Sequence, residues 1–289
     1  MQSDDECIPK ACSVQPCSSA AQHARRYKGL LVMLRVYLDR GAKSDADDGI
    51  IAVAATVFKA LGYKRFVRPW RRMLRGWRAS AFHATDFYNG AGDFKRDTAS
   101  KRERYEKDSK LIPRLVGENV EYILVVAARP DEFLQEASQQ WRETFGTNVH
   151  SISVQMILIA MGWWAEENHF NERFAYFREL GDDDDAEVAA TVERMREGHA
   201  DTARMIRVSS FAHIEKGVAK GTEASDLIAW HWNKWYMDKV RCGEAQNPRK
   251  DLAALVGFAE HKFKYIFLTG DYLKFFFSLK PREGSKVKL

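Results

Sequence analysis

The sequence predicts an α/β fold in which a sheet, antiparallel at its start and largely parallel beyond, carries helices on both faces. Short apolar runs of strand length alternate with longer segments of helical periodicity along most of the 289 residues. The hydrophobic content is 45%, and a chain of this size buries roughly three quarters of its unfolded surface. We therefore expect a globular body that folds without disulfides.

The first predicted elements are a hairpin and a basic helix. Strands over 34–39 and 50–57 are separated by a short polar turn, so they can pair antiparallel. A helix follows over about 59–78. The next segment, FHATDFYNGAGDF, is predicted to be a linker because Gly90 and Gly92 interrupt the helical pattern.

Helices and strands alternate through the remainder. The predicted order is a helix over about 98–116, a strand over 120–128, a helix opened by Pro130, a helix over about 148–168, a strand over 173–180, a helix over 185–199, a strand over 203–211 and a helix over 222–240. The last segment, HKFKYIFLTGDYLKFFFSL, is amphipathic and aromatic, and we expect it to cover one face of the core.

Residues 1–30 are polar and aperiodic and are predicted to be a flexible extension, whereas 31–289 form a single domain. Three of the four cysteines, Cys7, Cys12 and Cys17, lie in this extension, at a spacing that favours a solvated tail over a zinc site. No secretory signal opens the sequence, and its apolar helix is shorter than the ~20 residues of a membrane span. We expect a cytoplasmic protein that does not enter the membrane.

Three acidic residues stand where predicted elements end or begin. Asp39 ends the first strand, Glu179 ends a later strand, and Asp226 lies in the first turns of the helix over 222–240. Such carboxylates can converge at one edge of an α/β sheet, where three hard oxygens hold Mg²⁺ or Mn²⁺. Glu223 is a possible fourth ligand because residues three apart share a helix face. The alternative is that these acids only solvate strand ends or cap helices.

Four short motifs, in order, resemble the bacterial family called domain of unknown function 3800. They are YLD, FHATDF, YFRELG and GTEASDLIAW, between about Met33 and Trp235. The resemblance implies a ribonuclease H-like mixed sheet and metal-dependent hydrolysis of phosphodiesters in nucleic acid. It further implies one or two Mg²⁺ or Mn²⁺ ions, with Asp39, Glu179 and Asp226 as catalytic ligands.

The same resemblance covers His83 and Asp86, which match the family's His-x-x-Asp segment. His83 could move protons near neutral pH or simply cap a loop. Two positions depart: Arg40 stands where the family usually has Glu, and Glu223 where it usually has Gln. A guanidinium ~4 Å from a ligand carboxylate competes with the ion at about 4 kcal/mol, unless Arg40 faces the other side of the sheet. The alternative function is a non-catalytic one: if the missing Glu abolishes the metal site, the same scaffold is expected to bind nucleic acid or another partner without catalysis.

Residues 59–78 read KALGYKRFVRPWRRMLRGWR and contain no acid. The spacing of their cations predicts a basic stripe on one side of a helix, unless Pro69 breaks that helix. Arginine favours phosphate because its guanidinium can contact two oxygens at once. The residues expected to bind nucleic acid are Lys64, Arg68, Arg71, Arg72, Arg75 and Arg78. The alternative is that they pair with acids elsewhere, such as Asp182–Asp185. We expect that acidic run at a helix N-terminus and not at a metal, because adjacent side chains should not converge.

Overall fold

A mixed sheet organises the part of the chain that the computed structural model describes, which is residues 34–41, 49–139, 142, 146–198, 200–242, 249–271 and 273. The chain divides into two units, Met1–Val32 and Met33–Leu289. The described residues all lie in the second unit. The extension predicted over residues 1–30, with its three cysteines, lies outside the described residues.

Six strands of the described chain form one sheet. They are β1 (Leu34–Arg40), β2 (Ile51–Phe58), β3 (Tyr122–Ala128), β4 (Phe174–Glu179), β5 (Val208–Ile214) and β6 (Phe263–Leu268), in the order β5-β4-β1-β2-β3-β6. Strand β2 is antiparallel to β1 and β3, while the pairs β1–β4, β4–β5 and β3–β6 are parallel. Strands β2 and β3 are buried along their whole length, as expected where helices cover both faces.

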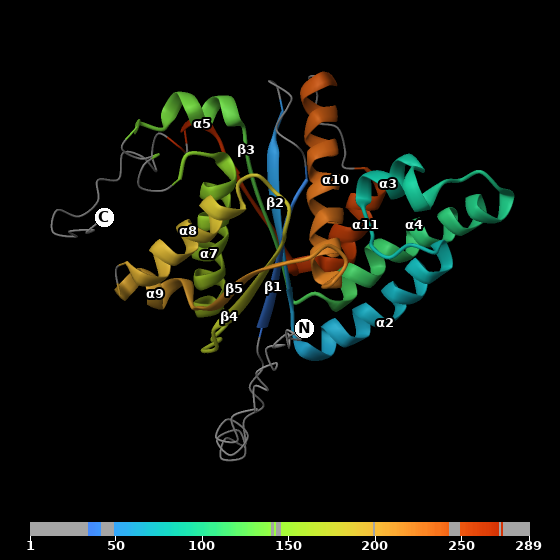
Figure 1. Cartoon of the computed structure of the whole chain (residues 1–289), viewed down its shortest axis with the longest axis horizontal. Coiled ribbons are helices and arrows are strands. Elements are labelled where there is room, and N and C mark those ends of the chain that lie inside the picture. The colour runs from blue at the N-terminus through green and yellow to red at the C-terminus, as the bar shows by residue number, and fades with distance from the viewer. Residues whose placement is uncertain are drawn as a thin grey trace, which may run out of the picture. The chain divides into compact units, whose positions relative to one another are not determined.

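The helices lie on both faces of this sheet. They are α2 (Ala60–Trp77), α3 (Ala84–Asn89), α4 (Ala99–Asn119), α5 (Pro130–Glu136), α7 (Val149–Glu167), α8 (Asp185–Glu197), α9 (Ala200–Ile206), α10 (Lys220–Cys242) and α11 (Lys250–Ala259), with 3-10 turns η1 (Gly92–Phe94) and η2 (Glu260–Lys262). Figure 1 shows α7, α8 and α9 on one face and α10, α11, α2 and α4 on the other. The predicted α/β mixed sheet with helices on both faces is confirmed by this strand order and these two helical layers.

The structure differs from three local predictions. Residues 203–211 are not one strand, because α9 continues to Ile206 and β5 begins at Val208, with Arg207 between them at a φ of 52°. The aromatic C-terminal segment was expected to cover one face of the core, but its Phe263–Leu268 part is the edge strand β6. The sheet is also less parallel than predicted, because the β2–β3 pair is antiparallel.

Helix α10 lies very close to β1. A Cβ atom on Gly221 would sit 2.1 Å from the ring of Tyr37, and one on Gly41 would sit 2.4 Å from the Ala229 carbonyl. The hydroxyl of Ser225 donates a 2.8 Å hydrogen bond to the Tyr37 carbonyl oxygen. Absent side chains therefore let the two backbones approach, and this contact fixes the first half of α10 against the end of β1.

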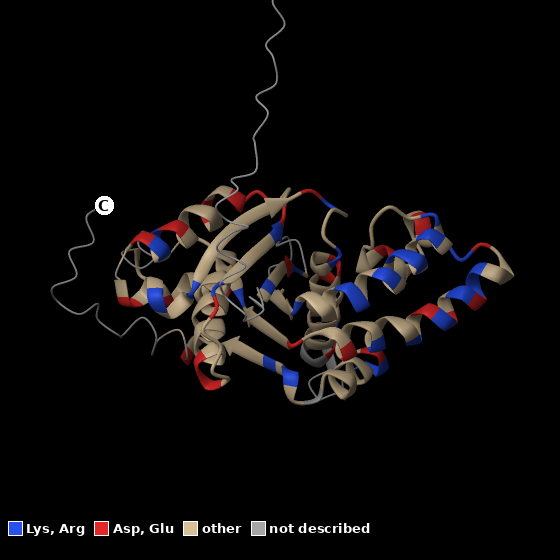
Figure 2. Cartoon of the chain, turned by 90° about the horizontal axis from the view of Figure 1, so that it is seen from below, with Lys and Arg blue, Asp and Glu red and all other residues tan. Residues whose placement is uncertain are grey.

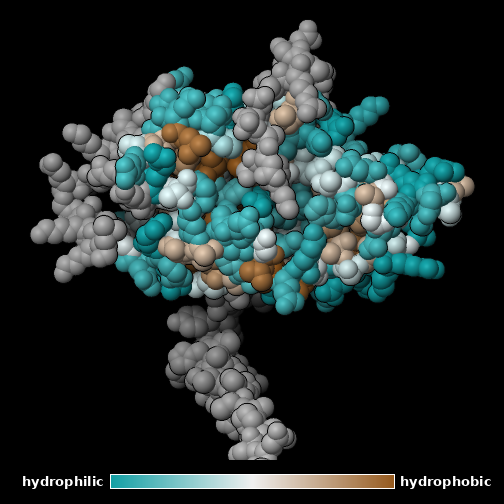
Figure 3. Space-filling view, turned by 45° about the horizontal axis from the view of Figure 1, so that its top comes forward, coloured by the Kyte–Doolittle hydropathy of each residue, from teal (hydrophilic) through white to brown (hydrophobic). Residues whose placement is uncertain are grey.

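Hydrophobic side chains are largely withdrawn from the surface. Figure 3 shows a mostly hydrophilic face on which hydrophobic colour is confined to separate patches. Among described helices, none is both long and apolar enough to cross a membrane.

Candidate metal and nucleic-acid site

A cavity of about 480 Å³ opens at the carboxyl ends of β1 and β4. Its lining includes Asp39, His83, Glu179, Asp182, Lys216 and Asp226. Three acids predicted from their places at element ends, Asp39, Glu179 and Asp226, thus meet in one cavity although they are distant in sequence. The parallel pairing of β1 with β4 brings the first two to the same edge of the sheet.

Each acid is held by its own element. Asp39 is half-buried at the end of β1, where its Oδ1 accepts the backbone N–H of Arg40 at 2.8 Å. Asp226 lies in the second turn of α10, is only 9% exposed, and accepts the Ala84 N–H through Oδ2 at 2.8 Å. Glu179 is the last residue of β4, and its Oε1 lies 3.7 Å from Nζ of Lys216.

The electrostatics of the cavity disfavour three ionised carboxylates. Burial raises the pKa of Asp39 well above its usual range, and the charges of Asp226 and Glu179 raise it further. Burial also raises the pKa of Asp226 to about 6, although the Ala84 N–H and Lys216 act in the opposite direction. The pKa of Glu179 is raised by burial as well, against the opposing effect of Lys216. Crowded carboxylates of this kind are relieved by a bound cation.

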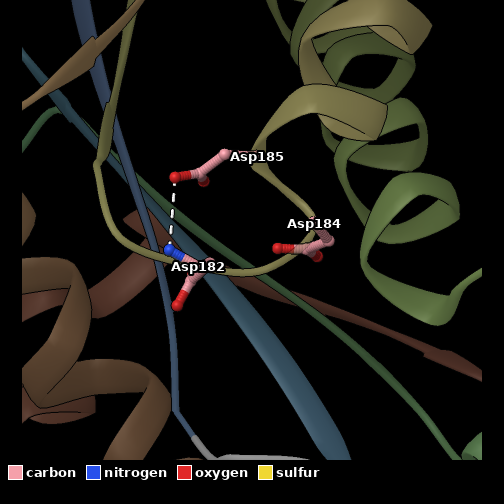
Figure 4. Close-up of side chains that lie close together, drawn as sticks. All are labelled: Asp182, Asp184 and Asp185. Atoms are coloured by element: carbon pink, nitrogen blue, oxygen red, sulfur yellow. Dashed lines mark hydrogen bonds between the residues drawn. The ribbon is translucent and has the colours of Figure 1, made fainter.

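A second acidic group lies in the loop between β4 and α8. Within the described ranges, Asp182, Asp184 and Asp185 are the acids whose ligand atoms gather within 4.8 Å of one another, close enough to hold a metal ion (Figure 4). The prediction that these neighbours do not converge is wrong. Oδ2 of Asp185 accepts the N–H groups of Gly181 and Asp182, at 2.8 and 3.2 Å, and so folds the loop back on itself.

A guanidinium already contacts all three members of this acidic group. Arg178 is 4% exposed, and its Nη2 lies 2.9 Å from Asp182 and 2.7 Å from Asp184, while its Nη1 lies 3.1 Å from Asp185. An internal cation therefore offsets part of the negative charge of the cluster. In the cavity, by contrast, Asp39, Glu179 and Asp226 are not gathered within 4.8 Å, so they must draw inward to share an ion.

Arg40 does not form an ion pair with Asp39. Its Nη2 lies 2.7 Å from Oδ1 of Asp182, and its Nη1 lies 3.4 Å from Nδ1 of His150. Successive strand residues point to opposite faces, and Leu38 pairs with Arg178 across the β1–β4 boundary. The two arginines therefore belong to one face and the acids that precede or follow them to the other. Arg40 nevertheless lines the cavity, at its edge beside Asp182.

His83 is the residue before α3, but its side chain makes no capping hydrogen bond. Its Nδ1 has no hydrogen-bond partner among the described residues and lies 3.9 Å from Oδ2 of Asp86. Burial and the charge of Lys216 lower the pKa of His83, so its imidazole is neutral at pH 7. The side chain of His83 therefore does not cap α3, and it lines the cavity. Its role in moving protons stays a prediction.

Glu223 is not in the cavity, contrary to prediction. It is 1% exposed, and its oxygens accept hydrogen bonds from Nε1 of Trp70 at 2.5 Å and Nζ of Lys220 at 2.7 Å. Three helical residues turn the direction of a side chain by about 60° from a full turn, which is enough to point Glu223 at α2 while Asp226 points at the cavity. Sequence reasoning missed both Lys220 and Lys216, since no local pattern marks a lysine that a carboxylate will meet.

Helix α2 presents a continuous basic face, and Pro69 lies inside it without interrupting it. Its apolar face, which includes Trp70 and Trp77, is buried. The predicted residues Lys64, Arg68, Arg71, Arg72, Arg75 and Arg78 are all exposed. The Lys and Arg positions of this helix can be followed in Figure 2.

The cations of α2 are not neutralised by the acidic loop, as the alternative proposed. Asp182, Asp184 and Asp185 pair instead with Arg40, Arg178, His150 and His213. Phe82, which lines the cavity, follows Arg78 closely in the chain, so the Cα atoms of these two residues are at most about 14 Å apart. The basic face of α2 thus ends near the acidic cavity.

Comparisons with known proteins add little to this geometry. No family model matches the chain, and no curated protein matches it. One similar solved structure is the ribonuclease H2 from Pyrococcus horikoshii OT3, with a TM-score of 0.38 and 12% sequence identity over 74% of this chain and 78% of that chain. So distant a similarity carries no argument about activity. The α/β fold rests on the sheet itself, and the resemblance to the domain of unknown function family stays a prediction.

Proposed function

We propose that this protein is a metal-dependent nuclease that hydrolyses phosphodiester bonds of nucleic acid at the cavity between β1, β4 and α10. The observation that carries the proposal is the meeting of Asp39, Glu179 and Asp226 in one cavity, where burial raises the pKa of each carboxyl. Their oxygens match the hard ligands that Mg²⁺ and Mn²⁺ prefer.

Each residue of the cavity has a distinct role in this proposal. Asp39, Glu179 and Asp226 would hold the ion, which when bound polarises a phosphodiester and lowers the pKa of water. Neutral His83, with a free Nδ1, accepts a proton from the attacking water. Lys216, which is exposed at the cavity, offers its ammonium group to a phosphate oxygen.

The nucleic acid would lie along α2. From Lys64 to Arg78 the helix is about 21 Å long, and its exposed cations have no acidic partners among the described residues. Arginine can engage two phosphate oxygens at once. Because the basic face ends close to Phe82 and His83, a backbone bound along it passes the mouth of the cavity.

A second candidate is a nucleic-acid-binding protein without catalysis. Arg40 favours this candidate, because its guanidinium lines the same cavity as the three acids. Such a protein would bind nucleic acid with strong salt dependence and would hold no divalent ion.

Cleavage assays separate the two candidates. Labelled single- and double-stranded DNA and RNA are incubated with the full chain and Mg²⁺ or Mn²⁺. We expect cleavage that is abolished by Asp39→Asn and by Asp226→Asn but retained by Asp93→Asn, which removes an exposed carboxylate outside the cavity. Cleavage that survives the first two substitutions would reject the site. No cleavage and no Mn²⁺ binding in calorimetry, together with salt-dependent binding of nucleic acid, would establish the non-catalytic candidate.

A further inference from the structure

We infer that a second cavity, on the α7 face of the sheet, binds a nucleobase of the strand whose phosphates pass the acidic cavity. It has a volume of about 440 Å³ and lies where β2 and α7 begin, whereas α10 and its Asp226 lie on the other face (Figure 1). We call it the α7 cavity; its lining includes Arg40, Ile51, Phe133, Leu134, Asn148 and His150. The inference rests on the proposed binding of nucleic acid and adds a contact to the bases.

The two cavities meet at Arg40 and Gly181, which line both. Gly181 has a φ of 123°, which suits glycine, and a Cβ there would meet nothing within 4 Å among the described residues. The N–H of Leu180 donates to the Ile214 carbonyl oxygen, and the N–H of Gly181 donates to Oδ2 of Asp185, both at 2.8 Å. The boundary therefore includes a tethered stretch of backbone that carries no side chain at Gly181. A nucleotide can cross it with its phosphate in one cavity and its base in the other.

Apolar side chains supply part of the wall of the α7 cavity. Ile51 and Phe133 are almost completely buried behind it, but Leu134 of α5 is 55% exposed. An exposed leucine in a hollow of the surface leaves apolar area in contact with water, and covering that area is favourable. Ligand cavities of this size are mostly apolar with a few polar groups that orient the ligand. A flat heteroaromatic ring matches this lining.

Polar residues of the lining have hydrogen-bonding atoms that the described residues do not use. Asn148 accepts the N–H of Ser151 through Oδ1 at 2.9 Å, which leaves its Nδ2 as a donor. Nδ1 of His150 contacts the carboxylate of Asp184, which accepts, so Nδ1 holds a proton. Nε2 of His150 is buried without a hydrogen-bond partner, and in a singly protonated ring it is an acceptor. A donor and an acceptor are what the edge of a base requires.

The charges of the lining exclude a phosphate as the ligand of the α7 cavity. Asp183 and Asp184 belong to the lining, while its cation, Arg40, is paired with Asp182 at 2.7 Å. Negative charge therefore prevails, and an anion would be repelled. An uncharged base is compatible with these acids, because its amino and ring N–H groups are donors.

Oligonucleotides with and without bases test this inference. Full-length protein in EDTA is titrated with a labelled single-stranded DNA and with an oligomer of equal length made of abasic sugar phosphates, and fluorescence anisotropy gives both affinities. The two oligomers carry the same charge, so contacts to phosphate largely cancel in the ratio of their dissociation constants, which we call the base preference. We expect the wild type to bind the oligomer with bases about tenfold more tightly.

Two substitutions assign the base preference to the α7 cavity. Leu134→Ala removes exposed apolar surface and should lower the base preference about fivefold. Asn148→Ser keeps an oxygen that caps Ser151 but removes the amide donor, and should lower it about threefold. Trp163→Ala is the control, because Trp163 is 51% exposed on α7 but lies about 21 Å along the helix from Val149. Thermal melts verify that each variant is folded.

The outcomes separate this inference from the proposed function. A lower base preference in the two cavity variants, with unchanged binding of the abasic oligomer and an unchanged control, supports the base site. No base preference in the wild type, an equal preference in all four proteins, or equal weakening of both oligomers would overturn it and leave the nuclease proposal intact. Cleavage of duplexes without binding of either oligomer would also overturn it alone. Neither binding nor cleavage of any nucleic acid would remove both proposals.

Discussion

Nε1 of Trp70 donates a hydrogen bond to Oε2 of Glu223 over 2.5 Å, so that a carboxylate of α10 is tied to the buried face of α2. The other oxygen of Glu223 pairs with Lys220 at 2.7 Å, and both partners of this ion pair are almost completely buried. These two contacts make Glu223 a structural residue and not a metal ligand, and measurements of stability and of metal binding can separate the two roles.

Glu223→Gln should destabilise the protein without affecting metal binding. Glutamine can still accept the indole N–H, but Lys220 is left as a buried charge without a carboxylate, a change that costs about 3–5 kcal/mol. Urea unfolding measures the loss, and calorimetry measures Mn²⁺ affinity. Glu118→Gln serves as the control, because the Arg114–Glu118 pair is exposed and contributes less than about 1 kcal/mol. If Glu223→Gln instead weakened Mn²⁺ binding and left stability unchanged, Glu223 would be a metal ligand after all.

Asp226→Asn should stabilise the metal-free protein at pH 7 and abolish its response to metal. The amide oxygen can still accept the Ala84 N–H, while a buried negative charge close to Asp39 is removed. We expect a gain of about 2 kcal/mol in the free energy of unfolding. Thermal melts with EDTA and with Mn²⁺ check both parts. A loss of stability in EDTA would show that the carboxylate is not under electrostatic stress.

The stability of the metal-free protein should depend on pH through Asp226. Its pKa is raised from 3.8 to about 6 in the folded protein, so the folded state binds the proton more tightly than the unfolded state does. The stabilisation is complete below pH 3.8 and is lost as pH rises through about 6, by up to about 3 kcal/mol. Urea unfolding in EDTA at pH 5 and pH 7 measures this contribution as the difference between wild type and Asp226→Asn, which also includes the effect of the Asp226 charge on the pKa of Asp39. Equal pH dependence of the two proteins would contradict it.

Arg178→Met should convert the acidic loop into a metal site. Without its guanidinium, the oxygens of Asp182, Asp184 and Asp185 remain within 4.8 Å of one another but lose their internal cation. We expect a loss of about 3–5 kcal/mol in the metal-free state and a rise in melting temperature on adding Mn²⁺. Arg129→Met is the control, since Arg129 pairs with Asp131 at the surface of α5. No additional ion in Arg178→Met would mean that the loop opens once the arginine is gone.

Replacing Arg68, Arg71 and Arg75 by alanine should weaken nucleic-acid binding mainly at low salt. Every arginine that neutralises a phosphate contributes about 0.9 to the slope of log affinity against log salt on B-form DNA, so the triple variant should have a slope smaller by about 2.7. Fluorescence anisotropy in EDTA gives this slope without cleavage. Arg196→Ala is the control, because Arg196 is paired with Glu193 on α8. An unchanged slope would exclude α2 as the binding surface.

The sequence predicted much of the fold because periodicity is a local property. The hairpin of β1 and β2, helix α2 and the buried run of α7 follow from spacing of apolar residues. The boundary between α9 and β5 did not follow, because Met205 and Ile206 suit the last turn of a helix as well as the start of a strand. Edge strand β6 also escaped prediction, since its aromatic residues have the composition of a strand but also of a covering helix.

The candidate site was predictable to the extent that it depends on where elements end. Asp39, Glu179 and Asp226 could be expected to meet once the order of strands was guessed. The ion-pair partners of the charged residues could not be predicted from the sequence, because tertiary contacts determine them. Arg178 stands directly before Glu179 in the sequence, yet the two side chains serve opposite faces of β4.

Because Gly221 has no side chain, the ring of Tyr37 in β1 packs directly against the backbone of α10. Residues that never touch a substrate can thereby set the separation between Asp39 and Asp226. A deep mutational scan selected for activity alone would therefore flag Gly221 as strongly as the acids themselves. Moving Asp39, Glu179 and Asp226 onto another scaffold would fail unless the close contact between Gly221 and Tyr37 were also reproduced there.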